Sequence, residues 1–182
     1  MKIKSAKKKS KIDYYTMEEA INYDAKRAKQ PSRKKELASL DYIIGKYTPE
    51  HITDVPVGTG FAFPVYEKYG CSARGIDISE DMLKQARKKN KDFILEKGSI
   101  FDSELGDFIV CIRLLNFFNK EKQIEILSRT KKYIFFIMRL RRRGYPENLH
   151  DRLNKAGLEL IEKIPISKKD NTIYSAYFCK KK

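Results

Sequence analysis

The chain has 182 residues, 41% of them hydrophobic, and its formal net charge is +15. This length and apolar fraction predict one domain with a proper core, and no apolar run approaches the roughly 20 residues that a membrane span needs. The 3 cysteines, at positions 71, 111 and 179, have no CxxC spacing, which excludes the usual zinc sites. No apolar signal core follows the basic start. We therefore expect a reduced, cytoplasmic protein without a bound metal.

The positive charge supports two interpretations. Such an excess raises affinity for phosphates and anionic surfaces, and so favours nucleic acid or another anionic partner. However, lysine far exceeds arginine, and Ile, Asn and Tyr are abundant. This composition is typical of proteins encoded by AT-rich genomes, such as those of some phages. Composition alone leaves both interpretations open.

The first predicted elements are helical. Residues 1–12 are basic in composition and predict a solvated tail. Apolar residues at helical spacing predict helices over 17–29, with Thr16 as N-cap, and over 33–47, where Leu37, Leu40, Ile43 and Ile44 form one stripe. We interpret residues 13–48 as an N-terminal helical lid.

Beyond residue 49 the chain alternates between strand-like and helix-like segments. The strand-like segments are 52–57, 73–78, 92–98, 107–115, 132–140, 158–164 and 172–178, and the helix-like ones are 61–69, 80–89, 119–130 and 147–156. This alternation predicts that residues 49–182 form an α/β, Rossmann-like, doubly wound domain, with a mostly parallel sheet of seven strands and the last strand antiparallel. The runs "FIVCI" and "YIFFIM" lack polar alternation, as expected for central strands buried on both faces.

Glycines mark the turn after the first predicted strand, in "DVPVGTG". In a doubly wound sheet, ligands bind beyond the carboxyl ends of the strands where strand order reverses, and Gly58 and Gly60 lie there. The GxGxxG dinucleotide fingerprint is incomplete, because position 63 is Phe. Asp54 would repel a pyrophosphate but suits a cationic ligand such as S-adenosylmethionine. Asp77, at the end of the next strand, can accept both ribose hydroxyls.

At this point the sequence resembles a known family. "DVPVGTG" followed by "GIDISEDMLKQA" resembles the class I S-adenosylmethionine-dependent methyltransferases, and "EKGSIFD" and "VCIRLLNFF" are similar to later motifs of that family. The resemblance covers residue 52 to about residue 130.

The resemblance implies a set of cofactor contacts. Asp54, Pro56, Gly58, Thr59 and Gly60 would shape the methionine pocket, Asp77 would hold the ribose, Ile78 and Met82 would flank the adenine, Ser99 and Ile100 would lie at its edge, and Arg113 and Leu114 would lie under the methionine chain. Relatives commonly carry Arg where this chain has Phe61. We expect Arg33 or Arg27, from the predicted lid, to supply the missing charge to the cofactor carboxylate.

Methyl transfer from a sulfonium is a direct displacement, so the protein mainly aligns the reacting atoms and excludes water. Asn116 and Arg113, at the end of the fourth strand, are therefore the candidates for contact with the reacting groups; a polar helix cap is the alternative role for Asn116. Two classes of methyl acceptor are disfavoured. The methylases of adenine and cytosine amino groups carry a [DNS]PPY box after the fourth strand, where this chain reads "IRLLNFF". Carbon-5 methylation of cytosine needs a nucleophilic Cys after Pro, and the sequence has no Pro-Cys pair.

An arginine cluster follows the fifth predicted strand, at Arg139, Arg141, Arg142 and Arg143. We interpret it as a patch for an anionic acceptor, either a small molecule or RNA; an exposed loop without a ligand is the alternative. Two other functions remain open: an enzyme that uses S-adenosylmethionine as a lyase or for alkyl transfer, and a nucleic-acid-binding module with a vestigial pocket. The oligomeric state is not indicated.

Overall fold

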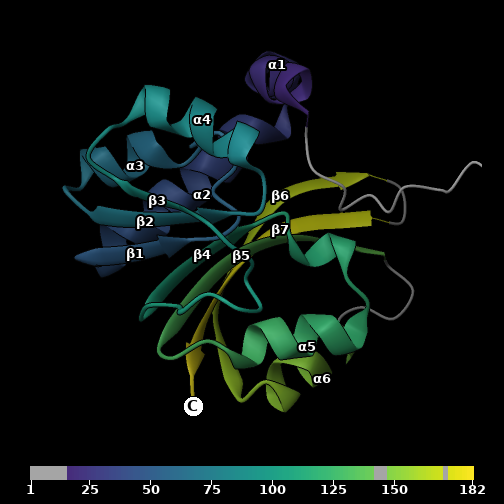
Figure 1. Ribbon diagram of the computed structural model, residues 1–182. Coiled ribbons are helices and arrows are strands. Elements are labelled where there is room, and N and C mark those ends of the chain that lie inside the picture. The colour runs from purple at the N-terminus through teal and green to yellow at the C-terminus, as the bar shows by residue number, and fades with distance from the viewer. Residues whose placement is uncertain (1–15, 142–146, 170–171) are drawn as a thin grey trace, which may run out of the picture.

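The computed structural model describes residues 16–141, 147–169 and 172–182, which build a seven-stranded sheet with helices on both faces (Figure 1). The strands are β1 (His51–Asp54), β2 (Ser72–Asp77), β3 (Ile94–Lys97), β4 (Phe108–Ile112), β5 (Tyr133–Arg141), β6 (Leu158–Lys169) and β7 (Thr172–Lys181). Their order is β3-β2-β1-β4-β5-β7-β6, with β7 antiparallel to both of its neighbours. This confirms the predicted Rossmann-like sheet, whose strand order reverses between β1 and β4.

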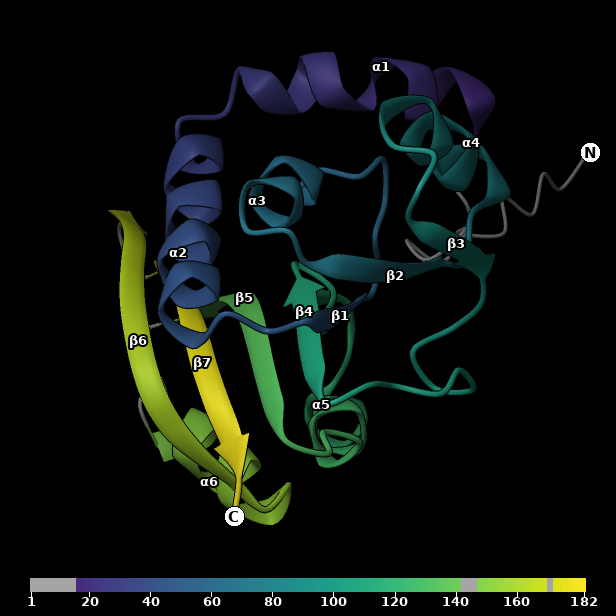
Figure 2. The same cartoon turned by 90° about the vertical axis from the view of Figure 1, so that its left-hand side faces the viewer.

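The helices form two layers. They are α1 (Met17–Ala28), α2 (Ser32–Tyr47), α3 (Phe63–Lys68), α4 (Glu80–Lys89), α5 (Lys120–Ser128) and α6 (Glu147–Lys155), with a short 3-10 turn η1 (Leu115–Phe117) after β4. Helices α2, α3 and α4 cover one face of the sheet, and α5 and α6 cover the other (Figure 1). Helix α1 runs from α2 towards α4, against which it packs (Figure 2).

Polar side chains fix the helix starts. Thr16 accepts a hydrogen bond from the Glu19 backbone N–H at 3.3 Å, and the Glu19 carboxylate accepts from the Thr16 backbone N–H, so the two residues form a capping box. Ser79 and Asn119 accept from the N–H groups three residues on, at 3.3 and 3.0 Å. Helix α2 begins at Ser32 with Pro31 as its N-cap residue and without a side-chain capping hydrogen bond.

The core consists of one apolar cluster on each face. Ile43 of α2 and Tyr66 of α3 belong to the first cluster, together with Phe135 of β5. The neighbouring residue of β5, Phe136, belongs to the second cluster with Leu127 of α5. Successive side chains of a strand point to opposite faces, so the part of β5 between the two clusters, residues 134–138, is apolar at every position, which explains its continuous run.

Several strand ends differ from the sequence prediction: β1, predicted over 52–57, ends at Asp54, and β7 continues three residues beyond its predicted end at 178, to Lys181. The segment predicted as a strand over 107–115 pairs only as far as Ile112, because Arg113 has a left-handed φ of 69°, and a 3-10 turn follows. Strand β6 continues five residues beyond the predicted end at Ile164, to Lys169. It passes Pro165 because it is an edge strand with register shifts at Leu160/Glu162 and Pro165/Ser167.

Some predicted features lie outside the described residues, namely the basic tail 1–12 and Arg142 and Arg143 of the arginine cluster. Within the described ranges, no helix has both the length and the apolar character that crossing a membrane requires. In the same residues, no three His, Cys, Asp or Glu side chains gather in a group that could hold a metal ion.

Candidate functional site at the carboxyl edge of the sheet

The glycine turn after β1 lies at the edge where strand order reverses. Gly58 and Gly60 have φ of 56° and 76°, a region that residues with a side chain rarely adopt. A Cβ at Gly58 would have no heavy atom within 4 Å, whereas one at Gly60 would lie 2.4 Å from the Phe63 ring. Gly60 is thus required by internal packing, and Gly58 leaves open space above the backbone. Pro56, in a cis peptide bond with Val55, and Gly58 are half-buried.

Asp77 connects this turn to the end of β2. Its carboxylate accepts from the backbone N–H of Gly58 and from that of Ser79, both at 2.9 Å, and the residue is 6% exposed. Burial raises the pKa of Asp77, and the backbone donors oppose that rise. Each carboxylate oxygen has two acceptor positions, so the two backbone bonds leave acceptor capacity for further hydroxyl donors.

Asp54, at the end of β1, is enclosed more completely. It is 3% exposed, and it accepts a hydrogen bond from the Tyr66 hydroxyl at 3.0 Å. Burial raises the pKa of Asp54 to about 8; the Tyr66 hydrogen bond lowers it and the charge of Asp77 raises it. A nearby cation would favour the ionised form of this carboxyl group.

The residues assigned to the adenine lie around the start of α4 and the turn after β3. Ile78 is half-buried. Met82, whose backbone N–H donates to the side chain of the N-cap residue Ser79, is 1% exposed. Ser99 is half-buried and accepts from the Phe101 N–H at 3.2 Å, while Ile100 packs in the second core cluster.

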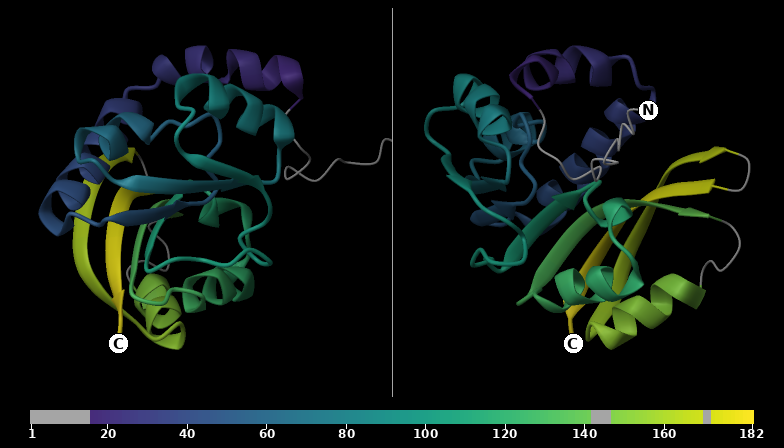
Figure 3. Two further views of the ribbon diagram at one scale, coloured as in Figure 1. Left: turned by 60° about the vertical axis from the view of Figure 1, so that its left-hand side comes forward. Right: turned by 45° about the vertical axis from the view of Figure 1, so that its right-hand side comes forward.

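A side-chain hydrogen bond joins helix α1 to the glycine turn. Thr59, 1% exposed, donates its hydroxyl hydrogen to the Asp24 carboxylate of α1 at 2.8 Å. Asp24 also pairs with Lys89 of α4 at 2.5 Å and with Arg33 of α2 at 3.5 Å. The Arg33 guanidinium lies 3.2 Å from the centroid of the Phe61 ring. Figure 3 shows α1 and α4 together on the same side of the sheet.

A buried ion pair joins α2 to the end of β4. The Glu36 carboxylate, 0% exposed, accepts hydrogen bonds from Nε of Arg113 at 3.0 Å and from its Nη2. The Tyr174 hydroxyl of β7 donates to the same carboxylate at 2.8 Å. Burial lowers the pKa of Arg33 to about 10, and the charge of Arg113 contributes to that lowering. Leu114, the next residue, is half-buried against the second core cluster.

Asn116 and Arg139 lie side by side beyond this pair. The Asn116 side-chain oxygen accepts from the Arg139 backbone N–H at 2.9 Å, which leaves its amide N–H groups for another partner. Arg139 is exposed, and its guanidinium lies 5.0 Å from the Tyr174 ring centroid. Arg139, inside the predicted fifth strand, and Arg141, one residue beyond its predicted end, both belong to β5, so the arginine cluster begins within the strand and not after it.

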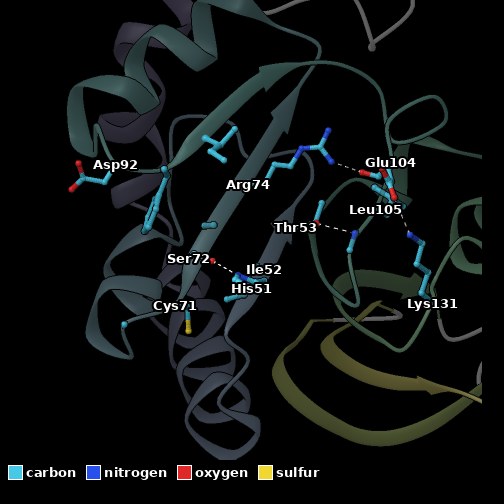
Figure 4. A pocket seen from close by; sticks show the side chains of 15 residues that line it. His51, Ile52, Thr53, Cys71, Ser72, Arg74, Asp92, Glu104, Leu105 and Lys131 are labelled. Carbon is cyan, nitrogen blue, oxygen red and sulfur yellow. Dashed lines mark hydrogen bonds and ion pairs between the residues drawn. The ribbon is translucent and has the colours of Figure 1, made fainter.

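A separate pocket of about 530 Å³ opens at the opposite, amino edge of the sheet (Figure 4). It lies among the starts of β1, β2 and β3, where His51 is exposed and Arg74 donates to the Glu104 carbonyl at 2.7 Å. None of the residues assigned to the cofactor lines it. It is therefore distinct from the candidate site.

The residues at the carboxyl edge fit S-adenosylmethionine. The space above Gly58 admits a ligand close to the backbone, and the Asp77 carboxylate beside it keeps acceptor capacity for the ribose. Asp54 offers a carboxyl group that a cationic ligand would ionise.

Sequence reasoning missed two acidic residues of the site, Asp24 and Glu36. Glu36 had a detectable signal, because it occupies the helical position i–4 to Leu40, on the apolar stripe of α2. A carboxylate on a buried stripe indicates a buried cationic partner. Asp24 had no such signal, because its partners come from two other helices and from the glycine turn.

Sequence comparisons find similarity to methyltransferases. Residues 53–132 match the family model described as a methyltransferase domain. A dTDP-3-amino-3,4,6-trideoxy-alpha-D-glucopyranose N,N-dimethyltransferase of Streptomyces venezuelae is 34% identical over 73 residues, 39% of this chain and 31% of that protein. A dTDP-3-amino-3,6-dideoxy-alpha-D-glucopyranose N,N-dimethyltransferase of Streptomyces fradiae is 31% identical over 96 residues, 50% of this chain and 37% of that protein. The matched part is thus about a third of each relative.

Solved structures share the fold. Magnesium protoporphyrin IX methyltransferase from Synechocystis, solved with bound S-adenosylmethionine, superposes with a TM-score of 0.70 at 15% identity, over 83% of this chain and 80% of that one. An S-adenosylmethionine-dependent methyltransferase from Clostridium acetobutylicum gives 0.66 at 13% identity, over 88% and 96%. Residues 53–132 therefore resemble a methyltransferase domain, and the chain has the fold of the class I S-adenosylmethionine-dependent methyltransferases.

Proposed function

We propose that this chain is an S-adenosylmethionine-dependent methyltransferase whose acceptor carries an anionic group. The observation that carries the first part is the open face of Gly58 beside the carboxylate of Asp77, at the strand-order reversal and within the matched domain. The same two features suit a nucleoside whose ribose hydroxyls point at a carboxylate.

The chain's own residues would then act by binding and alignment. Asp77 accepts from the ribose hydroxyls, and Arg33 supplies positive charge for the carboxylate of the methionine part. The cofactor, when bound, supplies a methyl group on a sulfonium that is already activated for displacement. Helices α1 and α2, held by Thr59–Asp24 and Glu36–Arg113, exclude water from the reacting atoms. Asn116, whose side-chain oxygen accepts from the Arg139 backbone N–H, would orient the acceptor through its amide N–H groups.

Two observations support an anionic acceptor. Arg139 is exposed beside Asn116, at the end of the sheet where the acceptor would enter. The two Streptomyces relatives are named for acceptors that are dTDP-linked amino sugars, and a dTDP group carries a diphosphate. A small phosphorylated molecule is therefore the acceptor class that we test first, with RNA as the second.

Cofactor binding is the first experiment. Calorimetry should show that the parent protein binds S-adenosylhomocysteine, while Asp77→Ala weakens binding by about 100-fold or more through loss of two charge-assisted hydrogen bonds. Asp77→Asn, which keeps an acceptor oxygen for one of the two backbone N–H groups, changes the turn less than Asp77→Ala does and should weaken binding as well. Asp81→Ala, which removes a carboxylate from the surface of α4, is the matched control and should bind as the parent does.

The outcomes separate the alternatives. Failure of the parent protein to bind at millimolar S-adenosylhomocysteine would contradict the proposal and favour a vestigial pocket. Equal affinity in the parent and both Asp77 variants would contradict the placement of the ribose. With S-adenosylmethionine and an acceptor, formation of S-adenosylhomocysteine identifies methyl transfer, whereas lyase or alkyl-transfer chemistry yields other products.

A further inference from the structure

One neutral oxygen at the carboxyl edge is contacted by two guanidinium groups. The side-chain carbonyl of Gln30, in the link between α1 and α2, accepts from Nη1 of Arg27 at 3.1 Å and from Nη1 of Arg113 at 3.2 Å. Arg27 comes from the last turn of α1, and Arg113 follows β4, 83 residues away from Gln30. Two cations from distant parts of the chain thus converge on an amide oxygen.

The charges around this point are not balanced. Glu36 engages Nε and Nη2 of Arg113, which leaves Nη1 for Gln30. Arg27 packs 5.0 Å from the Tyr23 ring centroid, and among the residues that the structure describes no carboxylate lies within ion-pair distance of it. Arg33 lies close enough for the charge of Arg113 to affect its titration. Positive charge therefore exceeds negative charge at the Gln30 oxygen.

Guanidinium N–H groups bind carboxylate and phosphate oxygens more strongly than neutral carbonyl oxygens, because the anionic acceptor adds a charge attraction. An amide oxygen between two such groups is therefore a weak occupant of a position that suits an anion. Gln30 and Arg27 are both half-buried, so each residue keeps part of its surface exposed to solvent.

We propose that Arg27 and Arg113 form a subsite for an anionic oxygen of the acceptor, a carboxylate or a phosphate, which takes the place of the Gln30 side-chain oxygen. This inference rests on the proposed function, since it assigns the acceptor's charged group to a place beside the candidate cofactor site. It also defines Gln30 as a residue that sets acceptor affinity.

The test exploits the opposite effects of two substitutions at Gln30. The probe is inorganic pyrophosphate, titrated by calorimetry into protein saturated with S-adenosylhomocysteine. Gln30→Ala removes the competing oxygen and should tighten pyrophosphate binding by about three- to tenfold. Gln30→Glu places a permanent carboxylate between the guanidinium groups and should abolish it. Arg27→Gln should weaken it by about tenfold or more.

The control removes the same charge from the same helix. Lys26 lies one position from Arg27, on the exposed side of α1, so the Lys26→Gln variant reports the effect of net charge alone. Its pyrophosphate affinity should differ from that of the parent by less than about twofold. Pyrophosphate affinities that fall equally for Arg27→Gln and Lys26→Gln, or that do not move in opposite directions for the two Gln30 variants, would overturn the subsite.

A second arm separates the acceptor from the cofactor as the source of the anion. S-adenosylhomocysteine has a carboxylate, whereas 5′-methylthioadenosine lacks the whole amino-acid part. We expect Arg27→Gln to bind both nucleosides as the parent does. Weaker binding of S-adenosylhomocysteine alone would assign the subsite to the cofactor carboxylate and overturn its assignment to the acceptor. Failure of the parent to bind either nucleoside would instead contradict the proposed function, whatever pyrophosphate does.

Discussion

Replacement of Asp54 by asparagine should change how the stability of the protein depends on pH. Asp54 is 3% exposed, and burial raises its pKa from 3.8 to about 8. Between these two values the unfolded chain has lost the proton and the folded protein keeps it. Unfolding therefore releases a proton, so the free energy of unfolding falls as the pH rises towards 8, and above pH 8 the contribution is constant.

The size of the effect follows from the pKa. Each pH unit between the two pKa values costs about 1.4 kcal/mol, so the interval from pH 5 to pH 8 corresponds to about 4 kcal/mol of lost stability. The asparagine side chain does not titrate, and its carbonyl oxygen can still accept from the Tyr66 hydroxyl. The stability of Asp54→Asn relative to the parent should therefore increase by about 4 kcal/mol between pH 5 and pH 9.

Urea unfolding of the cofactor-free protein, followed by circular dichroism at each pH, measures this difference. Titrating groups that do not interact with Asp54 are common to the two proteins and cancel, so the difference reports Asp54 and the groups coupled to it, such as Asp77. Tyr66→Phe provides a further check, because loss of the phenol donor should raise the pKa of Asp54 and extend the decline in stability to higher pH. Parallel stability curves for the parent and Asp54→Asn would refute the argument that this carboxyl group is buried in the protonated form.

Two further predictions concern the turn and the ion pair. Gly58→Ala and Gly60→Ala share the strain of a left-handed backbone, about 1–2 kcal/mol, but only Gly60→Ala also clashes with Phe63. Gly60→Ala should therefore unfold at lower urea, while Gly58→Ala should chiefly weaken S-adenosylhomocysteine binding; the reverse order would be inconsistent with the open face at Gly58. Glu36→Leu leaves the half-buried Arg113 without its carboxylate and should lose up to about 3 kcal/mol in urea unfolding. The double variant Glu36→Leu/Arg113→Met should recover most of that loss, and a double variant as unstable as Glu36→Leu would argue against the pair.

The sequence predicted the elements that local patterns determine. The apolar runs of β4 and β5 identified central strands, because burial on both faces leaves no room for polar alternation. Thr16 predicted the start of α1, where a capping box is found. The end of β4 was less predictable, because nothing in the local sequence marks the left-handed backbone of Arg113, and the partner of its side chain, Glu36, is 77 residues away in sequence.

The candidate site likewise has parts that local sequence motifs predict and parts that only the three-dimensional fold brings together. The glycine turn and Asp77 follow from a local motif, and the structure brings them together through the Gly58–Asp77 hydrogen bond. The roles assigned to individual cofactor contacts and to Asn116 and Arg139 stay predictions. The convergence of Arg27 and Arg113 on Gln30 could not be derived from sequence, because no local spacing relates α1 to the end of β4.

The position of β7 has a consequence for how the chain folds as it is synthesised. Strand β7 is synthesised after every other strand described, yet it lies between β5 and β6. Until it pairs, Tyr133–Arg141 presents an open, apolar edge, the kind of surface on which nascent chains associate with one another. Because β6 and β7 are consecutive and antiparallel, they can form a hairpin locally and then add to β5 as a unit, which shortens the time for which that edge is unprotected.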